Sequence, residues 1–186
     1  MIDEKEFRKI SLVISHALCH EPYVYGLVLD ENGWVSVDDI LSVLRAKNSK
    51  WYDINSATLE KMIAVSDKKR YEIYDGYIRA AYGHSFRRKL QRQATLSPVE
   101  LYHGTSPGAA EQIFKDGLLP MGRQYVHLSI DTQTAMQVGM RKSEHPIILK
   151  IKSQVAMQQG VIFYKGNDTV WLSDYIPKKF IEIDSQ

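Results

Sequence analysis

The stretch Leu101-Tyr102-His103-Gly104-Thr105, followed two dozen residues later by Val126-His127-Leu128-Ser129, decides how this chain folds. Each run has the apolar character of a strand and holds a histidine next to small or hydroxyl-bearing residues. Small neighbours let a ligand approach the backbone closely. Side by side, the two strands would form a cleft in which two imidazoles and several hydroxyls face a polar ligand. The alternative is that each histidine is a core residue with its hydrogen bonds satisfied inside the protein.

The composition is that of an ordinary globular protein of 186 residues, 44% of them hydrophobic and 25% charged. This length suits one large domain or two small ones. A single cysteine excludes an intramolecular disulfide and a cysteine-cluster metal site, and fits a reducing compartment. The histidines lack the spacing of metal ligands, so no metal is expected. The sequence has neither an apolar membrane span nor a signal-peptide core, so we expect a cytoplasmic protein, and a monomer by default.

The basic residues are unevenly distributed, although the net charge is only +2. Lys68-Lys69-Arg70 forms one cluster, and several arginines follow in a stretch without acidic residues between Asp75 and Glu100. This region is a candidate surface for the phosphates of a nucleic acid. A solvated basic face would have the same composition, and both interpretations stay open.

The first half of the chain has the pattern of helices followed by a hairpin. Helices are expected over residues 7–18, 36–44 and about 55–63, and strands over 70–74 and 77–81. Pro22 predicts where the first helix has ended, Ser36 is a candidate cap of the second, and Asp75-Gly76 is a strong hairpin signal. This is the outline of a winged-helix module, a class that includes both nucleic-acid-binding and protein-binding members.

The second half follows a polar, basic stretch at 85–98 that we interpret as a linker. Strands are expected near 99–103, 125–129, 146–152, 161–164, 169–173 and 179–183. Helices are expected over 107–115 and 132–138, ended by Gly117 and Gly139. The fold class is therefore α+β with a mostly antiparallel sheet, and the expected domains are residues 1–92 and 98–186.

From about Leu12 to Ile183 the chain resembles the RNA 2′-phosphotransferase family, the KptA proteins. The resemblance lies in a series of short motifs in a fixed order: Gly26–Asp30, Gly33–Asp38, Ser66–Tyr71, Ile78–Ala80, Gly83–Ser85, Leu101–Thr105, Gly117–Leu118, Met121–Arg123, Tyr125–Ser129, Val138–Gly139 with Arg141, and Val170–Leu172. Single motifs such as His-Gly-Thr are weak, but so many in this order are specific.

The resemblance implies a winged-helix-like lobe that faces RNA and a C-terminal lobe with the ADP-ribosyltransferase fold. It also implies a reaction in which an internal RNA 2′-phosphate, typically at a tRNA splice junction, attacks NAD+ and expels nicotinamide. The neighbouring ribose hydroxyl then resolves an RNA-phospho-ADP-ribose intermediate. The products are 2′-hydroxyl RNA, ADP-ribose 1″,2″-cyclic phosphate and nicotinamide. The implied partners are NAD+ and RNA.

The resemblance also implies roles for single residues. The implied catalytic residues, which would hold the phosphate, are His20, Arg70 and Arg123. The implied NAD+-binding residues are His103, Gly104, Thr105, His127, Ser129 and Arg141. The implied RNA-binding residues are Lys68, Lys69, Arg79, His84 and Ser85. Arg70 as a surface residue, Arg123 as a structural one and His20 as a helix-end residue favoured by the dipole remain alternatives.

The chain departs from the family pattern at two places, and from the pattern of related ADP-ribosyltransferases at a third. Cys19 stands where the pattern has an arginine beside the histidine, and cysteine supplies neither a fixed charge nor a forked contact. Ala81-Tyr82 replaces a polar pair. Val170 stands where related ADP-ribosyltransferases have a glutamate, which suits a phosphate nucleophile because a carboxylate there would repel it.

Three hypotheses follow. The first is a working RNA 2′-phosphotransferase. The second is an ADP-ribosyltransferase that performs only the first step on a phosphorylated acceptor. The third is a non-catalytic module that binds RNA or NAD+. The many remaining cationic residues of the RNA-facing set favour the first.

Overall fold

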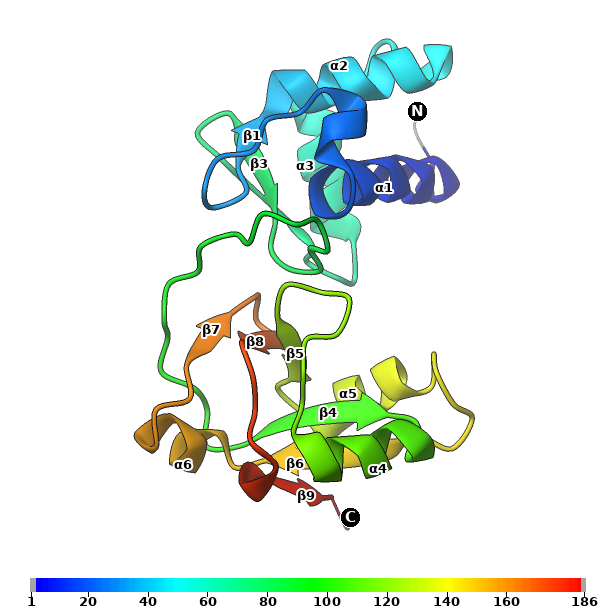
Figure 1. Ribbon diagram of the computed structural model, residues 1–186. Coiled ribbons are helices and arrows are strands. Elements are labelled where there is room, and N and C mark those ends of the chain that lie inside the picture. The colour runs from blue at the N-terminus through cyan, green and yellow to red at the C-terminus, as the bar shows by residue number, and fades with distance from the viewer. Residues whose placement is uncertain (1–2, 185–186) are drawn as a thin grey trace. The chain divides into compact units, whose positions relative to one another are not determined.

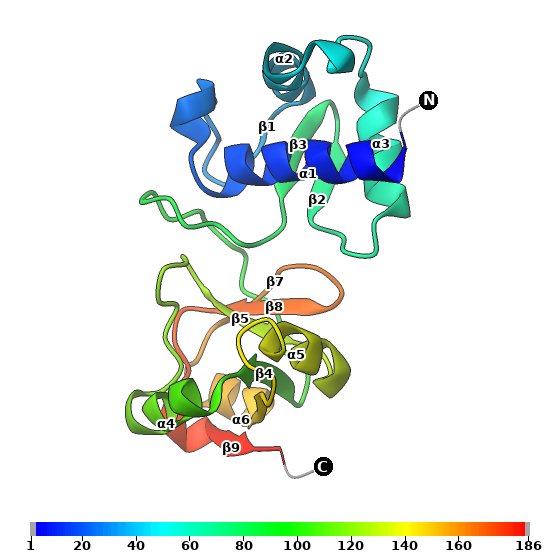
Figure 2. The same ribbon diagram turned by 90° about the vertical axis from the view of Figure 1, so that its right-hand side faces the viewer.

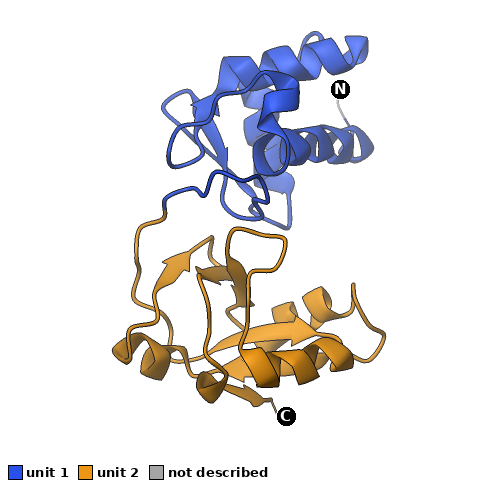
Figure 3. Cartoon of the chain, in the orientation of Figure 1, with its two compact units in different colours: residues 1–91 blue, residues 92–186 orange. Residues whose placement is uncertain are grey.

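The computed structural model describes residues 3–184 of a chain that divides into two compact units, residues 1–91 and 92–186 (Figure 3). The fold is α+β and its strand pairs are antiparallel, which confirms the predicted class. The division falls inside the stretch for which the sequence predicts a linker. Leu90 is buried and the Gln91 amide donates to the Glu31 carbonyl, so the start of that stretch packs onto the first unit.

Over residues 3–91, unit 1 contains three α-helices and a small sheet (Figure 1). Its elements are α1 (Glu4–Cys19), the 3₁₀ turn η1 (Pro22–Tyr25), β1 (Val35–Ser36), α2 (Val37–Lys47), the 3₁₀ turn η2 (Ser49–Trp51), α3 (Ser56–Val65), β2 (Tyr71–Tyr74) and β3 (Tyr77–Ala80). The side chains of Asp3, Ser36 and Asn55 cap the three α-helices by accepting hydrogen bonds from backbone amides. Each helix places its apolar side in one shared core.

The sheet of unit 1 has the strand order β1-β3-β2. The β2–β3 hairpin turns at Asp75 (φ 47°) and Gly76 (φ 77°), as the Asp-Gly pair predicts. β1 was not predicted, because two residues are too few to show a strand periodicity. It joins the sheet by pairing Val35 with Ile78 of β3.

Unit 2 contains one six-stranded antiparallel sheet with the order β7-β8-β5-β4-β6-β9. Its elements are β4 (Leu101–Thr105), α4 (Pro107–Asp116), β5 (Val126–Ser129), α5 (Thr132–Gly139), β6 (Ile147–Ile151), α6 (Ser153–Gln158), β7 (Phe163–Lys165), β8 (Val170–Ser173), the 3₁₀ turn η3 (Lys178–Phe180) and β9 (Ile181–Ile183). The second core lies between this sheet and its helices. The short helix α6 was not predicted.

The sheet of unit 2 is almost divided at its centre. β4 pairs with β6 over five residue pairs, but with β5 only through Tyr102 and Ser129. One half therefore consists of β5, β8 and β7, and the other of β4, β6 and β9, as Figure 1 and Figure 2 show. The two histidine-bearing strands of the sequence are the strands on either side of this join.

Gly104 serves the packing of a helix. A Cβ atom on Gly104 would lie 1.9 Å from the carbonyl oxygen of Ala135 and 2.9 Å from the backbone nitrogen of Gly139, both in α5. Close approach of backbone is therefore required here, as expected for glycine in a strand, but the approaching group is α5. A direct NAD+ contact of Gly104 remains a prediction.

Candidate active site

His103 and His127 meet at the join between β4 and β5. The Nδ1 atom of His103 lies 2.9 Å from the carbonyl oxygen of His127, and the Nδ1 atom of His127 lies 2.9 Å from the carbonyl oxygen of Tyr125. The His103 ring thus bridges the join where the strand ladder is interrupted. The structure brings the two histidines together, as the sequence predicts for two neighbouring strands.

The protonation of both rings follows from these contacts. A carbonyl oxygen only accepts, so each Nδ1 carries the hydrogen and each Nε2 carries a lone pair in the neutral ring. Burial, and then the charge of Arg123, lower the pKa of His127 to about 3. Burial also lowers the pKa of His103. At neutral pH both imidazoles are therefore neutral, each with a lone pair on Nε2, and the Nε2 atom of His127 is buried.

Arg123 places a positive charge near both histidines, since its charge lowers the pKa of each. It lies in the loop before β5 and is exposed. Its guanidinium has no hydrogen bond or ion pair with other residues of the range 3–184. Such a group is available to an anion, because guanidinium donors match the oxygens of a phosphate.

The other predicted NAD+-binding residues lie at the ends of these strands. Thr105 and Ser129 are buried at the ends of β4 and β5. Ser129 also pairs with Val170, the first residue of β8. Arg141 is exposed just after α5. Val170 thus lies on the strand that pairs with β5, next to the predicted site.

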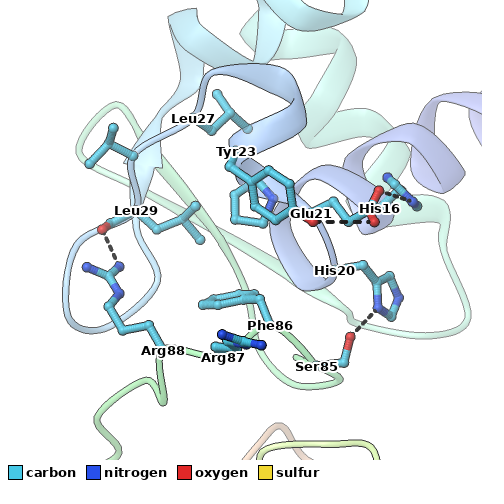
Figure 4. A pocket seen from close by; sticks show the side chains of 12 residues that line it. His16, His20, Glu21, Tyr23, Leu27, Leu29, Ser85, Phe86, Arg87 and Arg88 are labelled. Carbon is cyan, nitrogen blue, oxygen red and sulfur yellow. Dashed lines mark hydrogen bonds and ion pairs between the residues drawn. The ribbon is translucent and has the colours of Figure 1, made fainter.

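In unit 1, His20 and Ser85 form a pair. The Nδ1 atom of His20 lies 2.8 Å from the Ser85 hydroxyl, and both side chains are exposed (Figure 4). The Ser85 amide also donates to the carbonyl oxygen of Cys19, which ties the loop to the end of α1. One of the residues predicted to hold the phosphate is therefore in direct contact with one of those predicted to bind RNA.

The two predicted arginines of unit 1 differ in their surroundings. The Arg79 guanidinium lies 2.8 and 3.0 Å from Glu72 and 4.5 Å from the centre of the Trp34 ring. Arg70 is partly buried, and its side chain has no hydrogen bond or ion pair within the described residues 3–184. Arg70 is accordingly the better placed of the two to bind an external phosphate.

The remaining predicted RNA-binding residues have mixed settings. Lys69 donates to the carbonyl oxygens of Ile63 and Ala64 in the last turn of α3, so it caps that helix. Lys68 is exposed. His84 is buried, with its ring 5.8 Å from that of Phe86 in an edge-on arrangement. Their binding roles stay predictions.

A pocket of about 790 Å³ in unit 1 adjoins the His20–Ser85 pair (Figure 4). Its lining residues are His16, His20, Glu21, Pro22, Tyr23, Leu27, Val28, Leu29, Ser85, Phe86, Arg87 and Arg88. It combines an apolar wall with histidine and arginine side chains. The sequence analysis missed His16 in this pocket, although the spacing of four residues between His16 and His20 on one helix was a signal that they share a face.

The described residues, 3–184, contain no group of three or more histidine, cysteine or acidic side chains suited to a metal ion. In the same range, no helix is long and apolar enough to cross a membrane.

Comparison with known proteins defines the class of this chain. Residues 5–175 match the family model described as RNA 2′-phosphotransferase, Tpt1/KptA family. Similar proteins named "Probable RNA 2′-phosphotransferase" occur in Bacillus thuringiensis subsp. konkukian (47% identity, 99% of each chain) and Acetivibrio thermocellus (45% identity, 96% of this chain and 98% of the relative). Another, from Pectobacterium atrosepticum, is 40% identical over 96% of this chain and 98% of its own.

These matches cover nearly the whole chain and identify a transferase of the RNA 2′-phosphotransferase class. The chain belongs to the Tpt1/KptA family. The resemblance noted in the sequence is confirmed.

Two of the departures from the family pattern touch each other. The thiol of Cys19 is buried and lies 3.6 Å from the carbonyl oxygen of Tyr82. A thiol is only a weak donor, so this contact adds no charge to the site. Cys19 and the Ala81-Tyr82 pair are therefore in contact at the end of α1.

Proposed function

We propose that the protein transfers an internal RNA 2′-phosphate to NAD+, yielding 2′-hydroxyl RNA, ADP-ribose 1″,2″-cyclic phosphate and nicotinamide. The observation that carries the proposal is the pair of neutral histidines at the join of β4 and β5, with the charge of Arg123 beside them. Family membership supplies the reaction class, and this arrangement supports the dependence on NAD+.

The architecture of the units supports the same proposal. A six-stranded antiparallel sheet with flanking helices fits the mostly antiparallel ADP-ribosyltransferase-like lobe that the family resemblance implies. Three helices followed by a hairpin fit a winged-helix-like lobe that contacts RNA. We infer these fold names from the arrangement of elements and from the family.

The residues of unit 2 fit a bound dinucleotide. A neutral imidazole with its Nε2 lone pair free of a proton accepts a hydrogen bond from a ribose hydroxyl, so His103 and His127 would orient the ribose. Thr105 and Ser129 add hydroxyls at the strand ends. When bound, NAD+ supplies an electrophilic ribose carbon whose bond to nicotinamide is broken. Arg123 would stabilise the negative charge of the phosphate that replaces nicotinamide.

The residues of unit 1 fit the 2′-phosphate. The Ser85 hydroxyl orients the His20 ring through Nδ1, and in the proposed complex the ring would donate to a phosphate oxygen. Arg70 brings a guanidinium that has no other partner in the described range. A histidine and an arginine together provide the donors that a phosphate dianion needs.

A single-turnover reaction tests the proposal. The substrate is an RNA oligonucleotide with one internal 2′-phosphate, incubated with the full chain in the presence and absence of NAD+ and analysed by mass spectrometry. We expect NAD+-dependent conversion to 2′-hydroxyl RNA together with release of nicotinamide. Binding of NAD+ without any change in the RNA would contradict the proposal.

Matched variants locate the reaction. His103→Ala should raise the KM for NAD+ by about tenfold or more, because a hydrogen bond to a buried acceptor is lost. His145→Ala changes an exposed histidine of the same unit. It should leave the KM for NAD+ and the KM for RNA within about twofold of the values of the unaltered protein. An unchanged KM for NAD+ in the His103 variant would show that this histidine does not hold the ribose.

A second candidate is an ADP-ribosyltransferase that stops after the first step, and the observation in its favour is the uncharged, buried thiol of Cys19. In that case ADP-ribose would remain attached to the RNA phosphate in the same single-turnover experiment. Accumulation of the attached species to the end of the reaction favours this candidate, and its rapid disappearance excludes it.

A further inference from the structure

Both ring nitrogens of His16 have a partner. Its Nε2 atom lies 3.5 Å from a carboxylate oxygen of Glu21, and its Nδ1 atom lies 3.0 Å from the Tyr25 hydroxyl. With a hydrogen on Nε2 facing the carboxylate, the neutral ring accepts the Tyr25 hydroxyl hydrogen at Nδ1. In the protonated ring, Nδ1 donates to the same hydroxyl. Both protonation states therefore hold the ring in one orientation.

Glu21 is the residue that this arrangement controls. One of its carboxylate oxygens faces His16, and the other lies 3.5 Å from the Tyr23 hydroxyl. Glu21 directly follows His20, and both side chains line the same pocket (Figure 4). A carboxylate in that wall would repel a phosphate at His20 unless it were turned aside.

His16 also lies one helical turn before His20, with the ring centres 6.0 Å apart. His16 lies in the last turn of α1 and His20 is the C-cap of that helix. The two histidines have different partners: Ser85 for His20, and Glu21 with Tyr25 for His16. The His20 ring faces the loop that carries Ser85, whereas the His16 ring contacts the Glu21 carboxylate.

We propose that His16 is a positioning residue that holds the Glu21 carboxylate away from a phosphate bound at His20. This inference rests on the proposed function, in which His20 binds the 2′-phosphate. It adds a residue whose effect on the site passes through Glu21. The recognised ligand is a nucleotide that carries a phosphate on its 2′-hydroxyl.

A double-mutant cycle tests the inference, because it separates repulsion by Glu21 from a general loss of structure. His16→Leu frees the carboxylate, and Glu21→Gln removes its charge while keeping its shape. The side chains of His16 and Glu21 are 46% and 45% exposed, so solvent screens the repulsion and the expected effects are modest.

The first readout is the dissociation constant of adenosine 2′-monophosphate, measured at pH 7.5 by NMR titration of the full chain. We expect His16→Leu to weaken binding by about fivefold and the variant with both changes to bind within about twofold of the unaltered protein. Tyr25→Phe leaves the contact between His16 and Glu21 in place, so it should change the dissociation constant of adenosine 2′-monophosphate by less than about twofold. His145→Leu, an exposed histidine of unit 2, is the matched control.

The second readout is the KM for 2′-phosphorylated RNA in the NAD+-dependent reaction. We expect it to rise in His16→Leu and to recover when Glu21→Gln is added, while the KM for NAD+ stays unchanged. Equal weakening in His16→Leu and in the doubly changed protein would overturn the inference, since His16 would then only support the fold. Absence of binding to the unaltered protein would also overturn it.

The two readouts separate the inference from the proposed function. If the unaltered protein leaves the RNA unchanged but the binding cycle behaves as expected, the reaction is wrong and the role of His16 stands. If the RNA is converted but Glu21→Gln fails to restore binding, the reaction stands and the role of His16 is wrong.

Discussion

The cationic side chains of unit 1 share a charge but differ in what holds them. Arg79 is fixed by Glu72 and Trp34, and Lys69 is fixed by carbonyl groups of α3. Arg70 has no such partner within residues 3–184. A cation with internal partners supports the fold, whereas one without them is available to a ligand. This difference separates residues that look alike in the sequence.

We expect Arg70→Gln to lower the single-turnover rate with 2′-phosphorylated RNA by about a hundredfold or more, as for the loss of one transition-state donor. Its midpoint of thermal unfolding should stay within about 2 °C of the unaltered protein. Arg79→Gln is the matched variant and should lower the free energy of unfolding by about 1 kcal/mol. Thermal unfolding and rapid-quench kinetics of both variants measure these effects. If Arg70→Gln lowered the stability and Arg79→Gln lowered the rate, the division into a ligand-binding and a structural arginine would be wrong.

The buried histidines predict a pH dependence. Burial lowers the pKa of His127 from its ordinary 6.5 to about 3, so between these values the unfolded chain binds a proton that the folded chain excludes. The contribution of His127 to the free energy of unfolding is therefore complete above pH 6.5 and is lost progressively as the pH falls toward 3.

We expect the free energy of unfolding to fall less steeply between pH 6 and 4 in His127→Gln than in the unaltered protein, by up to about 1.4 kcal/mol per pH unit. Denaturant unfolding at a series of pH values measures the two slopes. Parallel slopes would mean that His127 titrates normally in the folded protein.

At the scale of elements, the contact between α5 and β4 depends on Gly104. Because a Cβ at this position would lie 1.9 Å from a carbonyl oxygen of α5, any side chain forces the helix away from the strand. The strand β4 also carries His103, whose ring donates a hydrogen bond to the His127 carbonyl oxygen in the neighbouring strand β5. The packing of α5 thus positions the candidate site.

Gly104→Ala should lower the free energy of unfolding by about 3 kcal/mol or more, because backbone atoms have to move. The control is Gly108→Ala in α4, where an added Cβ meets nothing within 4 Å. That change should be neutral or stabilising by up to about 1 kcal/mol, since alanine favours a helix. Denaturant unfolding of both proteins compares them, and equal stabilities would show that α5 adapts without cost.

Most elements could be predicted from the sequence, because their signals are local. Capping side chains at Ser36 and Asn55, the Asp75-Gly76 turn and helix-ending glycines each act within a few residues. The strand β4 begins two residues later than the predicted run at 99–103. The helix α6 and the strand β1 were missed, because six and two residues are too short for a periodic pattern.

The site was less predictable, because it depends on contacts between distant residues. The two histidines were found, but a single residue pair between β4 and β5 has no signature in the sequence. The sequence likewise shows that Gly104 is small without showing that α5 requires it. The ion pair between Arg79 and Glu72 forms because the two residues lie opposite each other in β3 and β2, and this register is fixed only in the folded hairpin.

At the scale of the whole molecule, the distribution of charge matters more than its sum. The net charge is only +2, yet no acidic residue occurs between Asp75 and Glu100, where Arg87, Arg88 and Lys89 are exposed. A chain of this kind attracts a polyanion through a local region, so its binding of RNA should depend on salt.

We expect the logarithm of the RNA dissociation constant to rise linearly with the logarithm of salt concentration, and Arg87→Gln to reduce that slope by about 0.7. Lys61→Gln, an exposed change in α3, serves as the comparison and should leave the slope unaltered. Fluorescence anisotropy at several salt concentrations gives the slopes. An identical slope in both variants would place the RNA away from Arg87.

The near-division of the sheet in unit 2 has a consequence for association between chains. Strands at the rim of a sheet expose main-chain groups on which a foreign strand can add, and proteins protect such rims. In unit 2 the interrupted ladder lies in the interior of the sheet, between two three-stranded halves. The two flanking halves of the sheet leave no room for a foreign strand to pair at this join. The interruption is thus enclosed by both halves of the sheet and adds no exposed edge on which another chain could pair.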